Sequence, residues 1–483
     1  MTFNSWEFLI FYPIVAALYF LLPKKCKWPM LLIASYYFYA FYQAELLFLI
    51  ILTTAISFFM SHLIERTEKT SLRKVYLALT LVVCLGVLFF YKYFNFLSSS
   101  ITGIISLLGG EPPEIVLNLV LPVGISFYTF QTLSYVIDVY RGDVKTEKNI
   151  FFFALFVSFF PQLVAGPIER PGNLIPQLKE EHKPSYDNFV RGSKQMILGF
   201  FKKICVADLV SSYVSAVYNS AQEATSLAVV LATLMFAVQI YCDFSGYTDI
   251  ATGCARIMGI RLMKNFDRPY SASSIKEFWA RWHISLSGWF KDYLYFPLGG
   301  SRCSRPRHAL NLFIVFMVSG LWHGASWTFV VWGALHGIYR VVGILTEKKR
   351  NKLVCRAGFE PDSRLVRGVR RVITFILVSF AWIFFRANTI RDALTLVGAL
   401  FTKHASITSA LSLMNLDTVS IFLIIFAIAT LLVLDRALSY DENDGSDILV
   451  KNGAFIYYVF AIIFVWLLLL SRGQSSTFIY FQF

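Results

Sequence analysis

Charged side chains are scarce in this sequence of 483 residues. Asp, Glu, Lys and Arg make up 15% of it, while 57% is hydrophobic and 17% is aromatic. A soluble globular domain carries about 25% charged residues. So much apolar surface needs a solvent other than water, and the bilayer supplies one. The composition therefore predicts a membrane protein and excludes an ordinary soluble enzyme.

Acidic residues are outnumbered by basic ones, which gives the chain a formal net charge of +14. In a soluble protein such an excess suggests a nucleic-acid partner. Here the basic residues collect in short loops between apolar runs, as the positive-inside bias requires. No basic patch has the context of a groove-reading motif. We expect the protein to contact membrane lipid and not to bind nucleic acid.

Several motifs of soluble chemistry are missing. The sequence has no CxxC pair among its seven cysteines, no GxSxG elbow and no Walker loop, so it predicts neither a disulfide framework, a serine hydrolase nor an NTPase. His283, His323 and Cys242 match no compact ligand spacing, and we expect no metal. No internal repeat or low-complexity tract divides the chain, which predicts one membrane domain over residues 1–483.

Long apolar runs are abundant. The first, Phe8–Leu22, has no basic region before it and three lysines after it. It predicts a retained helix with the N-terminus outside, whereas the basic connection Glu347–Arg371 is expected in the cytoplasm. At about 20 residues per crossing, the chain predicts about 11 transmembrane helices, with Phe151–Val164 and Leu310–Leu321 short enough to be re-entrant. The other predicted spans are Trp28–Tyr42, Leu46–Leu63, Val75–Phe96, Val116–Tyr140, Met196–Tyr218, Leu227–Tyr241, Ser326–Leu345, Val372–Phe385, Ile421–Leu434 and Phe455–Leu470.

The central segment, residues 241–337, departs from this pattern. YCDFSGYTDIATGCARIMGI places Asp243 and Ser245 in an otherwise apolar stretch. An ionisable group at bilayer depth is costly unless it is paired or faces water. Two interpretations stay open: a polar cavity or tunnel built on Asp243 and its neighbours, or a buried Asp243 that pairs with Arg256 or Arg281 to fix helix packing.

The next segment, SASSIKEFWARWHISLSGWFKDYLYFPLGGSR, predicts an amphipathic helix that lies at the membrane interface. His283 is at the edge of its apolar stripe, where it can face a cavity. Taken alone, such a histidine is more typical of a satisfied interfacial residue than of a catalyst. The predicted apolar face comprises Ile275, Phe278, Trp279, Trp282, Leu286, Trp289, Phe290 and Tyr293.

A second histidine, His323, lies within the apolar run VSGLWHGASWTFVVWGALHG, with Gly320 and Gly324 giving room for close backbone approach. An imidazole accepts and returns a proton near neutrality, which suits acyl transfer either as a general base or as a nucleophile. The residues alone leave His323 evenly balanced between catalysis and packing. For His336 they favour a helix-packing hydrogen bond.

At these residues the sequence resembles the membrane-bound O-acyltransferase family, in particular its bacterial branch of alginate and other polysaccharide O-acetyltransferases. The resemblance covers essentially the whole chain. It rests on NSWEFLIFYPIV, PVGISFYTFQTLSYVIDVYRG, FPQLVAGPIERP, YCDFSGYTDIA, NFDRPYSASSIKEFWARWHISLS, GLWHGASWTFVVWGALHG, WIFFRA and FIYFQF.

The resemblance implies that His323 matches the family's catalytic histidine and His283 its second functional histidine. It also implies an all-α polytopic fold, with transmembrane, re-entrant and interfacial helices around a central tunnel. The expected tunnel or substrate-binding residues are Asp243, Ser245, Tyr247, Trp282, Trp322 and Arg281.

The resemblance further implies a substrate and a location. Acetyl-CoA, or another activated acyl donor, is expected on the cytoplasmic side of a bacterial cell membrane. Its acyl group would pass His323 and reach an extracellular or periplasmic partner acyltransferase that modifies a polysaccharide. Basic residues at the tunnel mouth would attract the coenzyme phosphates, with Lys264, Arg268 and Arg281 as candidates.

Three alternatives remain. D-alanyl transfer to teichoic acid is the alternative within the enzyme class. A multi-pass transporter or flippase belongs to a different class, but transporters often show two related halves with matching broken helices, and the first half has no counterpart of the central segment. A non-catalytic scaffold for polysaccharide export would not need both histidines.

Overall fold

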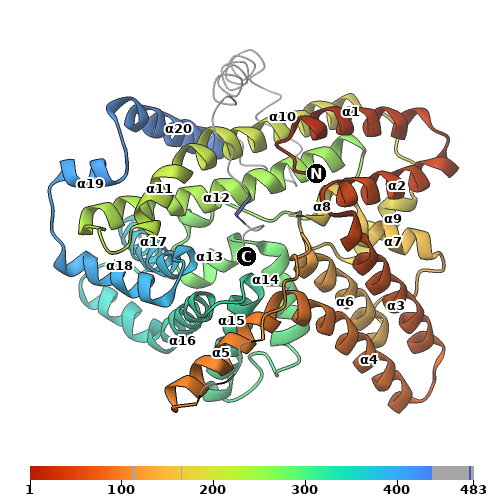
Figure 1. Cartoon of the computed structure of the whole chain (residues 1–483), viewed down its shortest axis with the longest axis horizontal. Helices are drawn as coiled ribbons and strands as arrows, with labels where there is room; N and C mark the ends of the chain where they lie inside the picture. The colour runs from red at the N-terminus through yellow and green to blue at the C-terminus, as the bar shows by residue number, and fades with distance from the viewer. Residues whose placement is uncertain (111, 113–114, 165, 438–477, 480–483) are drawn as a thin grey trace. The chain divides into compact units, whose positions relative to one another are not determined.

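The computed structural model describes residues 1–110, 112, 115–164, 166–437 and 478–479 (Figure 1). Within these ranges every regular element is a helix, which confirms the predicted all-α class. The contacts divide the chain into two compact units. The first comprises Met1–Met196, Thr248–Lys264 and Lys291–Tyr293, and the second contains the rest. The single domain expected over residues 1–483 stays a prediction.

Membrane crossing is supported by length and composition. Five helical stretches in the described part of the chain are long and apolar enough to span a bilayer, or six if one bent pair counts as a span. The chain is thus a multi-pass membrane protein, while the count of about 11 stays a prediction. The predicted span Phe455–Leu470 lies outside the described residues. The five stretches are Ala44–Arg66, Thr70–Leu107, Ser226–Ile257, Trp327–Arg356 and Arg364–Arg386, and the bent pair is Ile407–Leu413 with Thr418–Leu434.

Helices of the first unit pack mainly around α3, which contacts α4, α6 and α7 (Figure 1). Gly124, at φ +75°, precedes α6 and fits closely, since a Cβ there would lie 2.8 Å from the carbonyl oxygen of Leu163. The predicted span Val116–Tyr140 becomes helical only at Ile125. The unit's elements are α1 (Trp6–Leu21), α2 (Lys24–Gln43), α3 (Leu47–Arg66), α4 (Thr70–Leu88), α5 (Phe94–Leu107), α6 (Ile125–Arg141), α7 (Ile150–Ser158), α8 (Phe160–Leu163), α9 (Pro171–Lys179) and most of α10 (Tyr186–Phe200).

The second unit holds the central segment. Its long helix α12 (Ser226–Ile257) continues past Tyr247 into residues assigned to the first unit. A π-helical stretch, η3 (Phe201–Asp208), precedes α11 (Leu209–Asn219). The other helices are α13 (Ile275–Arg281), α14 (Ile284–Phe290), α15 (Arg305–His323), α16 (Trp327–Arg356), α17 (Arg364–Arg386), α18 (Ile390–Thr402), α19 (Ile407–Leu413) and α20 (Thr418–Ala437).

The prediction of a single amphipathic helix after Ser274 was wrong. The segment is broken at Trp282 and His283 into α13 and α14, and a π-helical stretch follows at Lys291–Tyr295. His283 has a left-handed backbone with φ +45°, which no helix accommodates. Seven of the eight residues on the predicted apolar face are buried within the protein, because the two short helices pack into it and do not lie on its surface.

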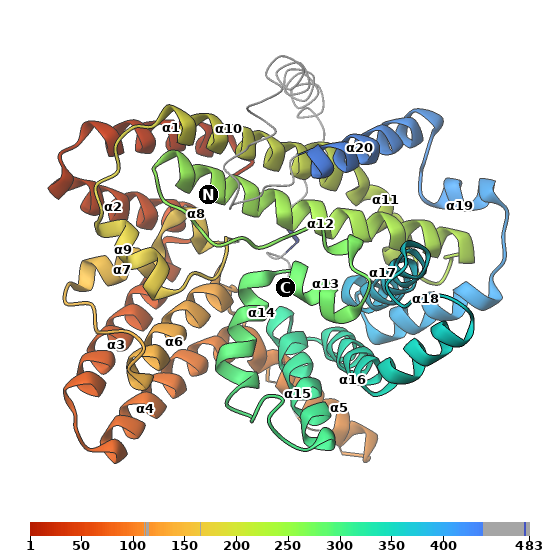
Figure 2. The ribbon, with the colours of Figure 1, turned by 180° about the vertical axis from the view of Figure 1, so that it is seen from behind.

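Helices α15 and α16 pack closely against each other and run side by side in both views (Figures 1 and 2). They meet at two glycines. A Cβ on Gly333 would lie 2.5 Å from the carbonyl oxygen of Phe316 and 3.2 Å from the Cα of Gly320. Since real Cβ atoms do not approach a backbone oxygen so closely, only glycine permits this crossing. The crossing places His323, one turn beyond Gly320, against Trp332 of α16.

We expect Gly333→Ala to weaken the fold by about 1–3 kcal/mol, because the added methyl group meets a backbone atom that cannot yield without separating the helices. The measurement is thermal unfolding in detergent, followed by tryptophan fluorescence. Gly343→Ala is the matched control, since it lies on the same helix with nothing within 4 Å of its Cβ. Equal melting temperatures for the two variants would contradict the close crossing.

Candidate active site

His323 is the last residue of α15 and is only 3% exposed. Aromatic rings surround its imidazole. Trp322, Trp332 and Phe385 all contact it edge-on, with ring centroids 5.0, 4.9 and 5.5 Å away. Gly324 ends the helix, and a Cβ there would collide with the ring of Phe329. The glycines on both sides of His323 thus do what the sequence predicted: they allow close packing around this histidine.

His283 lies at the break between α13 and α14 and is fully buried. Its ring contacts Phe244 of α12 at 4.7 Å and Trp322 at 5.8 Å, both edge-on. Trp322 therefore touches both histidines. Burial lowers the pKa of the His283 imidazole to about 3, so this group is neutral at physiological pH.

Asn265, in the loop before α13, contacts three residues of the turn that carries His283. Its Oδ1 lies 3.1 Å from His283 Nδ1 and accepts hydrogen bonds from the backbone N–H and the hydroxyl of Ser285, at 3.3 and 2.8 Å. Its backbone oxygen accepts from the N–H of Ile284 at 2.9 Å. The sequence analysis missed Asn265, since a polar residue in a loop carries no signal of burial, yet it is only 1% exposed.

Asp243 is buried and paired, as one of the two interpretations held, but the predicted arginine partner was wrong. Lys203 of η3 forms ion pairs with Asp243 at 2.7 Å and with Asp208 at 2.9 Å. The second carboxylate oxygen of Asp243 accepts a hydrogen bond from the backbone N–H of Ile479 at 2.7 Å. Lys203 was overlooked, although its place in the apolar run Met196–Tyr218 is the usual sign of a functional or paired charge.

The other candidates around Asp243 lie along the same part of the chain. Ser245 and Tyr247 are buried on α12, and the Tyr247 ring stacks on Phe478 with centroids 4.3 Å apart. Phe244, between Asp243 and Ser245 in sequence, contacts both Phe478 and His283. This face of α12 connects the ion-pair cluster with the histidine turn.

Trp282 extends the aromatic cluster. Its ring centroid lies 5.2 Å from that of Trp382, which stacks on Trp332 at 5.8 Å. Trp332 in turn contacts His323. Trp282, Trp322, His283 and His323 thus belong to one continuous set of buried rings, and their role as site residues stays a prediction.

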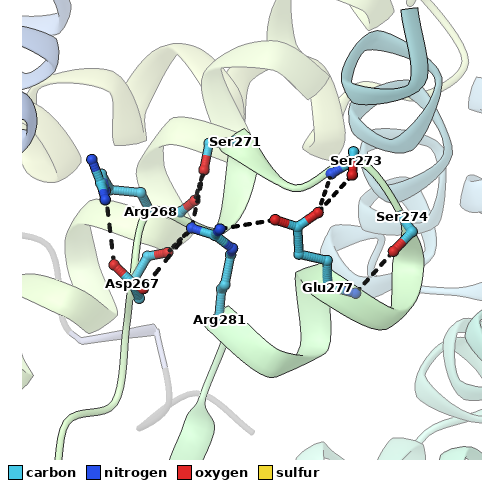
Figure 3. A network of polar contacts seen from close by, with 7 residues as sticks. All are labelled: Asp267, Arg268, Ser271, Ser273, Ser274, Glu277 and Arg281. Atoms are coloured by element: carbon cyan, nitrogen blue, oxygen red, sulfur yellow. Dashed lines mark hydrogen bonds and ion pairs between the residues drawn. The ribbon is translucent and has the colours of Figure 1, made fainter. Parts of the chain in front are cut away.

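Arg281, another candidate, is engaged in a polar network (Figure 3). Its guanidinium pairs with Glu277 at 2.8 Å and with Asp267 at 3.9 Å, and its backbone oxygen accepts from the N–H of Asp267 at 2.9 Å. Glu277 also accepts hydrogen bonds from the backbone N–H and the hydroxyl of Ser273. The network ties the loop before α13 to the end of α13, next to Trp282 and His283.

His336 has the packing role that the sequence favoured. Its Nδ1 accepts a hydrogen bond from Trp279 Nε1 at 3.2 Å, and its ring is fully buried. Among the described residues, no group of three or more His, Cys, Asp and Glu side chains is placed to hold a metal ion.

The arrangement suits proton transfer in a dry environment. Two buried imidazoles share one tryptophan, and aromatic rings fill much of the space around them. Exclusion of water strengthens the electrostatic interactions of a reacting group and suppresses hydrolysis of an activated ester. The chain is thus a multi-pass membrane protein in which this pair of buried histidines is the candidate active site.

The chain belongs to the membrane-bound O-acyltransferase family, whose model matches residues 31–388, and it is an acyltransferase. A protein named "Probable alginate O-acetylase AlgI" from Pseudomonas aeruginosa is 38% identical over 430 residues, which cover 88% of this chain and 80% of the relative. A protein of the same name from Pseudomonas putida is 35% identical over the full length of both chains. The "Peptidoglycan O-acetyltransferase" of Helicobacter pylori is 33% identical, over 82% of this chain and 78% of its own.

We expect Lys203→Met to destabilise the protein by about 3–5 kcal/mol, because it leaves Asp208 and Asp243 buried without their cation. The measurement is the fraction of folded protein recovered from membranes and its melting temperature. Arg191→Gln is the control, since the pair of Arg191 with Asp187 is partly solvated and worth about 0–1 kcal/mol. A Lys203→Met protein as stable as the control would show that the ion pairs of Lys203 do not stabilise the fold.

Proposed function

We propose that the protein moves an acetyl group across the membrane for the O-acetylation of a cell-surface polysaccharide. The observation that carries the proposal is the pair of buried histidines, His323 and His283, that share contact with Trp322. The relatives named above support the acyl group and the class of acceptor, because two are named for alginate acetylation and one for peptidoglycan acetylation.

In the proposed reaction His323 is the catalytic base. Its imidazole takes the proton of an acceptor hydroxyl as the oxygen attacks the carbonyl carbon of the acetyl thioester. The carbon–sulfur bond breaks, and the imidazolium returns the proton to the departing thiolate. The products are an O-acetyl ester and a free thiol, so atoms and charge balance. His283, neutral at physiological pH, is proposed to hold the acceptor by accepting a hydrogen bond from a group other than the reacting hydroxyl.

The donor and the setting are part of the same proposal. Acetyl-CoA is the proposed donor, presented on the cytoplasmic side of the bacterial inner membrane. A small neutral acetyl group can then pass to the outside while the charged coenzyme stays behind. A partner acyltransferase outside the membrane is the proposed immediate receiver, which passes the group to the polymer.

We expect His323→Ala to abolish O-acetylation of the extracellular polymer, because the removed base contributes about 10²–10⁴-fold to such a reaction. Cells that express wild type, His323→Ala or His404→Ala at matched membrane levels are compared by the ester content of their polymer. His404 is exposed and serves as the control. Unchanged acetyl ester with His323→Ala would overturn the proposal, and loss of D-alanyl ester instead would favour the teichoic-acid alternative.

Arg281 allows a separate test of how the donor binds. Because Glu277 and Asp267 already hold its guanidinium, we expect Arg281→Gln to lower kcat by about fivefold or less, the value of a partly exposed ion pair, and to leave the donor KM unchanged. Steady-state kinetics in vesicles measure both constants, with the exposed Arg391→Gln as control. A rise in donor KM at constant kcat would instead assign Arg281 to the coenzyme phosphates, as the sequence suggested.

A further inference from the structure

His283 is held in a conformation that is unfavourable by itself. A left-handed backbone costs a residue with a side chain roughly 1–2 kcal/mol, and His283 adopts one at φ +45° while fully buried. Such a conformation persists only where the surrounding structure determines it several times over, and it is concentrated at functional sites. The residues that contact this turn therefore indicate why His283 is held in this conformation.

One side chain makes three polar contacts to this turn. Asn265 Oδ1 meets His283 Nδ1, Ser285 N and Ser285 Oγ, all within 3.3 Å. The backbone oxygen of the same residue accepts from Ile284 N. Three consecutive residues of the turn are thus bound by one asparagine 18 positions earlier in the chain.

These contacts settle which nitrogen of His283 carries the proton. A backbone N–H is always a donor, so the bond from Ser285 N requires the oxygen end of the Asn265 amide at this position, not the nitrogen end. The same oxygen faces His283 Nδ1, which must therefore donate. In a neutral imidazole the proton then lies on Nδ1, and Nε2 carries the lone pair.

We propose that Asn265 is a positioning residue for acyl transfer, which fixes both the orientation and the tautomer of His283 so that Nε2 is the nitrogen able to accept a hydrogen bond or a proton. The inference rests on the proposed function, since it assumes that His283 takes part in the reaction. It adds a residue that contacts neither His323 nor, in this account, the substrate.

The network in Figure 3 keeps Asn265 in place. Asp267, two residues after Asn265, donates its backbone N–H to the carbonyl of Arg281, two residues before His283. The ion pair of Arg281 with Glu277 braces the same end of α13. The loop and the turn are therefore joined both by Asn265 itself and by this adjacent pair of residues.

A purely structural role is the competing explanation, and the test separates the two. Asn265→Leu keeps the volume but removes the acceptor. Asn265→Asp keeps the acceptor for Nδ1–H and adds a negative charge, which stabilises the imidazolium and raises the pKa of His283. Asn311→Leu is the matched control, because Asn311 is an equally buried asparagine of the same unit whose amide donates to Gly300 and not to a histidine.

Acetyl transfer by the purified proteins in vesicles is measured as kcat and donor KM between pH 4 and 9. We expect Asn265→Leu to lower kcat about 10²-fold or more, the contribution of a positioned proton-transfer group, without a change in donor KM. Asn265→Asp should retain activity at pH 8 and, as the solution is acidified, lose it at a higher pH than the wild type, because only the neutral His283 accepts a hydrogen bond. The other charged groups near this turn, Asp243, Asp267 and Arg281, are ion-paired, and none of them is changed by these substitutions.

Wild-type kcat in Asn265→Leu, or an unshifted acid limb in Asn265→Asp, would overturn the inference. If Asn265→Leu does not fold, the pH profile of Asn265→Asp decides alone, because a structural role does not move it. His283→Gln is measured alongside. Full activity in that variant would refute the role proposed for His283, whereas an inactive His283→Gln with an active Asn265→Leu would refute the role of Asn265 alone.

Discussion

The contact between Gly320 and Gly333 is the constraint on which the second unit depends. Two backbones that touch without side chains between them fix the crossing of α15 and α16 and leave no room for adjustment. Trp332, next to Gly333, is thereby set against His323, and its stacking on Trp382 carries the same constraint to α17. The histidine therefore lies on a rigid surface, which is what a group that must meet a reacting atom within a few tenths of an ångström requires.

Two features that oppose folding lie near the aromatic rings that contact the histidines. A left-handed residue at His283 and a buried Lys203 between two carboxylates each oppose folding unless their partners are in place. Phe244 links them, since it follows Asp243 in the chain and contacts His283. Strain and buried charge placed together in one region indicate a site kept for chemistry, because packing alone would be satisfied by apolar residues.

Much of the site followed from the sequence, and the exceptions have physical causes. An imidazole between glycines in an apolar run is conspicuous, so His323 and its close packing were predicted from GLWHG. The break at His283 was not, since helical periodicity reveals which face is apolar but not a single left-handed residue that ends the helix. The partner of Asp243 was misjudged because it is 40 residues away, and pairing at that separation depends on how η3 packs on α12. Asn265 gave no signal, because its burial is set by the fold and not by its neighbours in the chain.

The most direct measurement of the central claim follows the acetyl group itself. Purified protein in sealed vesicles is given acetyl-CoA labelled in both the acetyl group and the adenine on one side, with a hydroxyl acceptor on the other. The account predicts that acetyl label appears on the acceptor while the adenine label and the free thiol remain on the donor side. Acceptor that stays unlabelled while donor is consumed, or adenine label that crosses with the acetyl group, would contradict it.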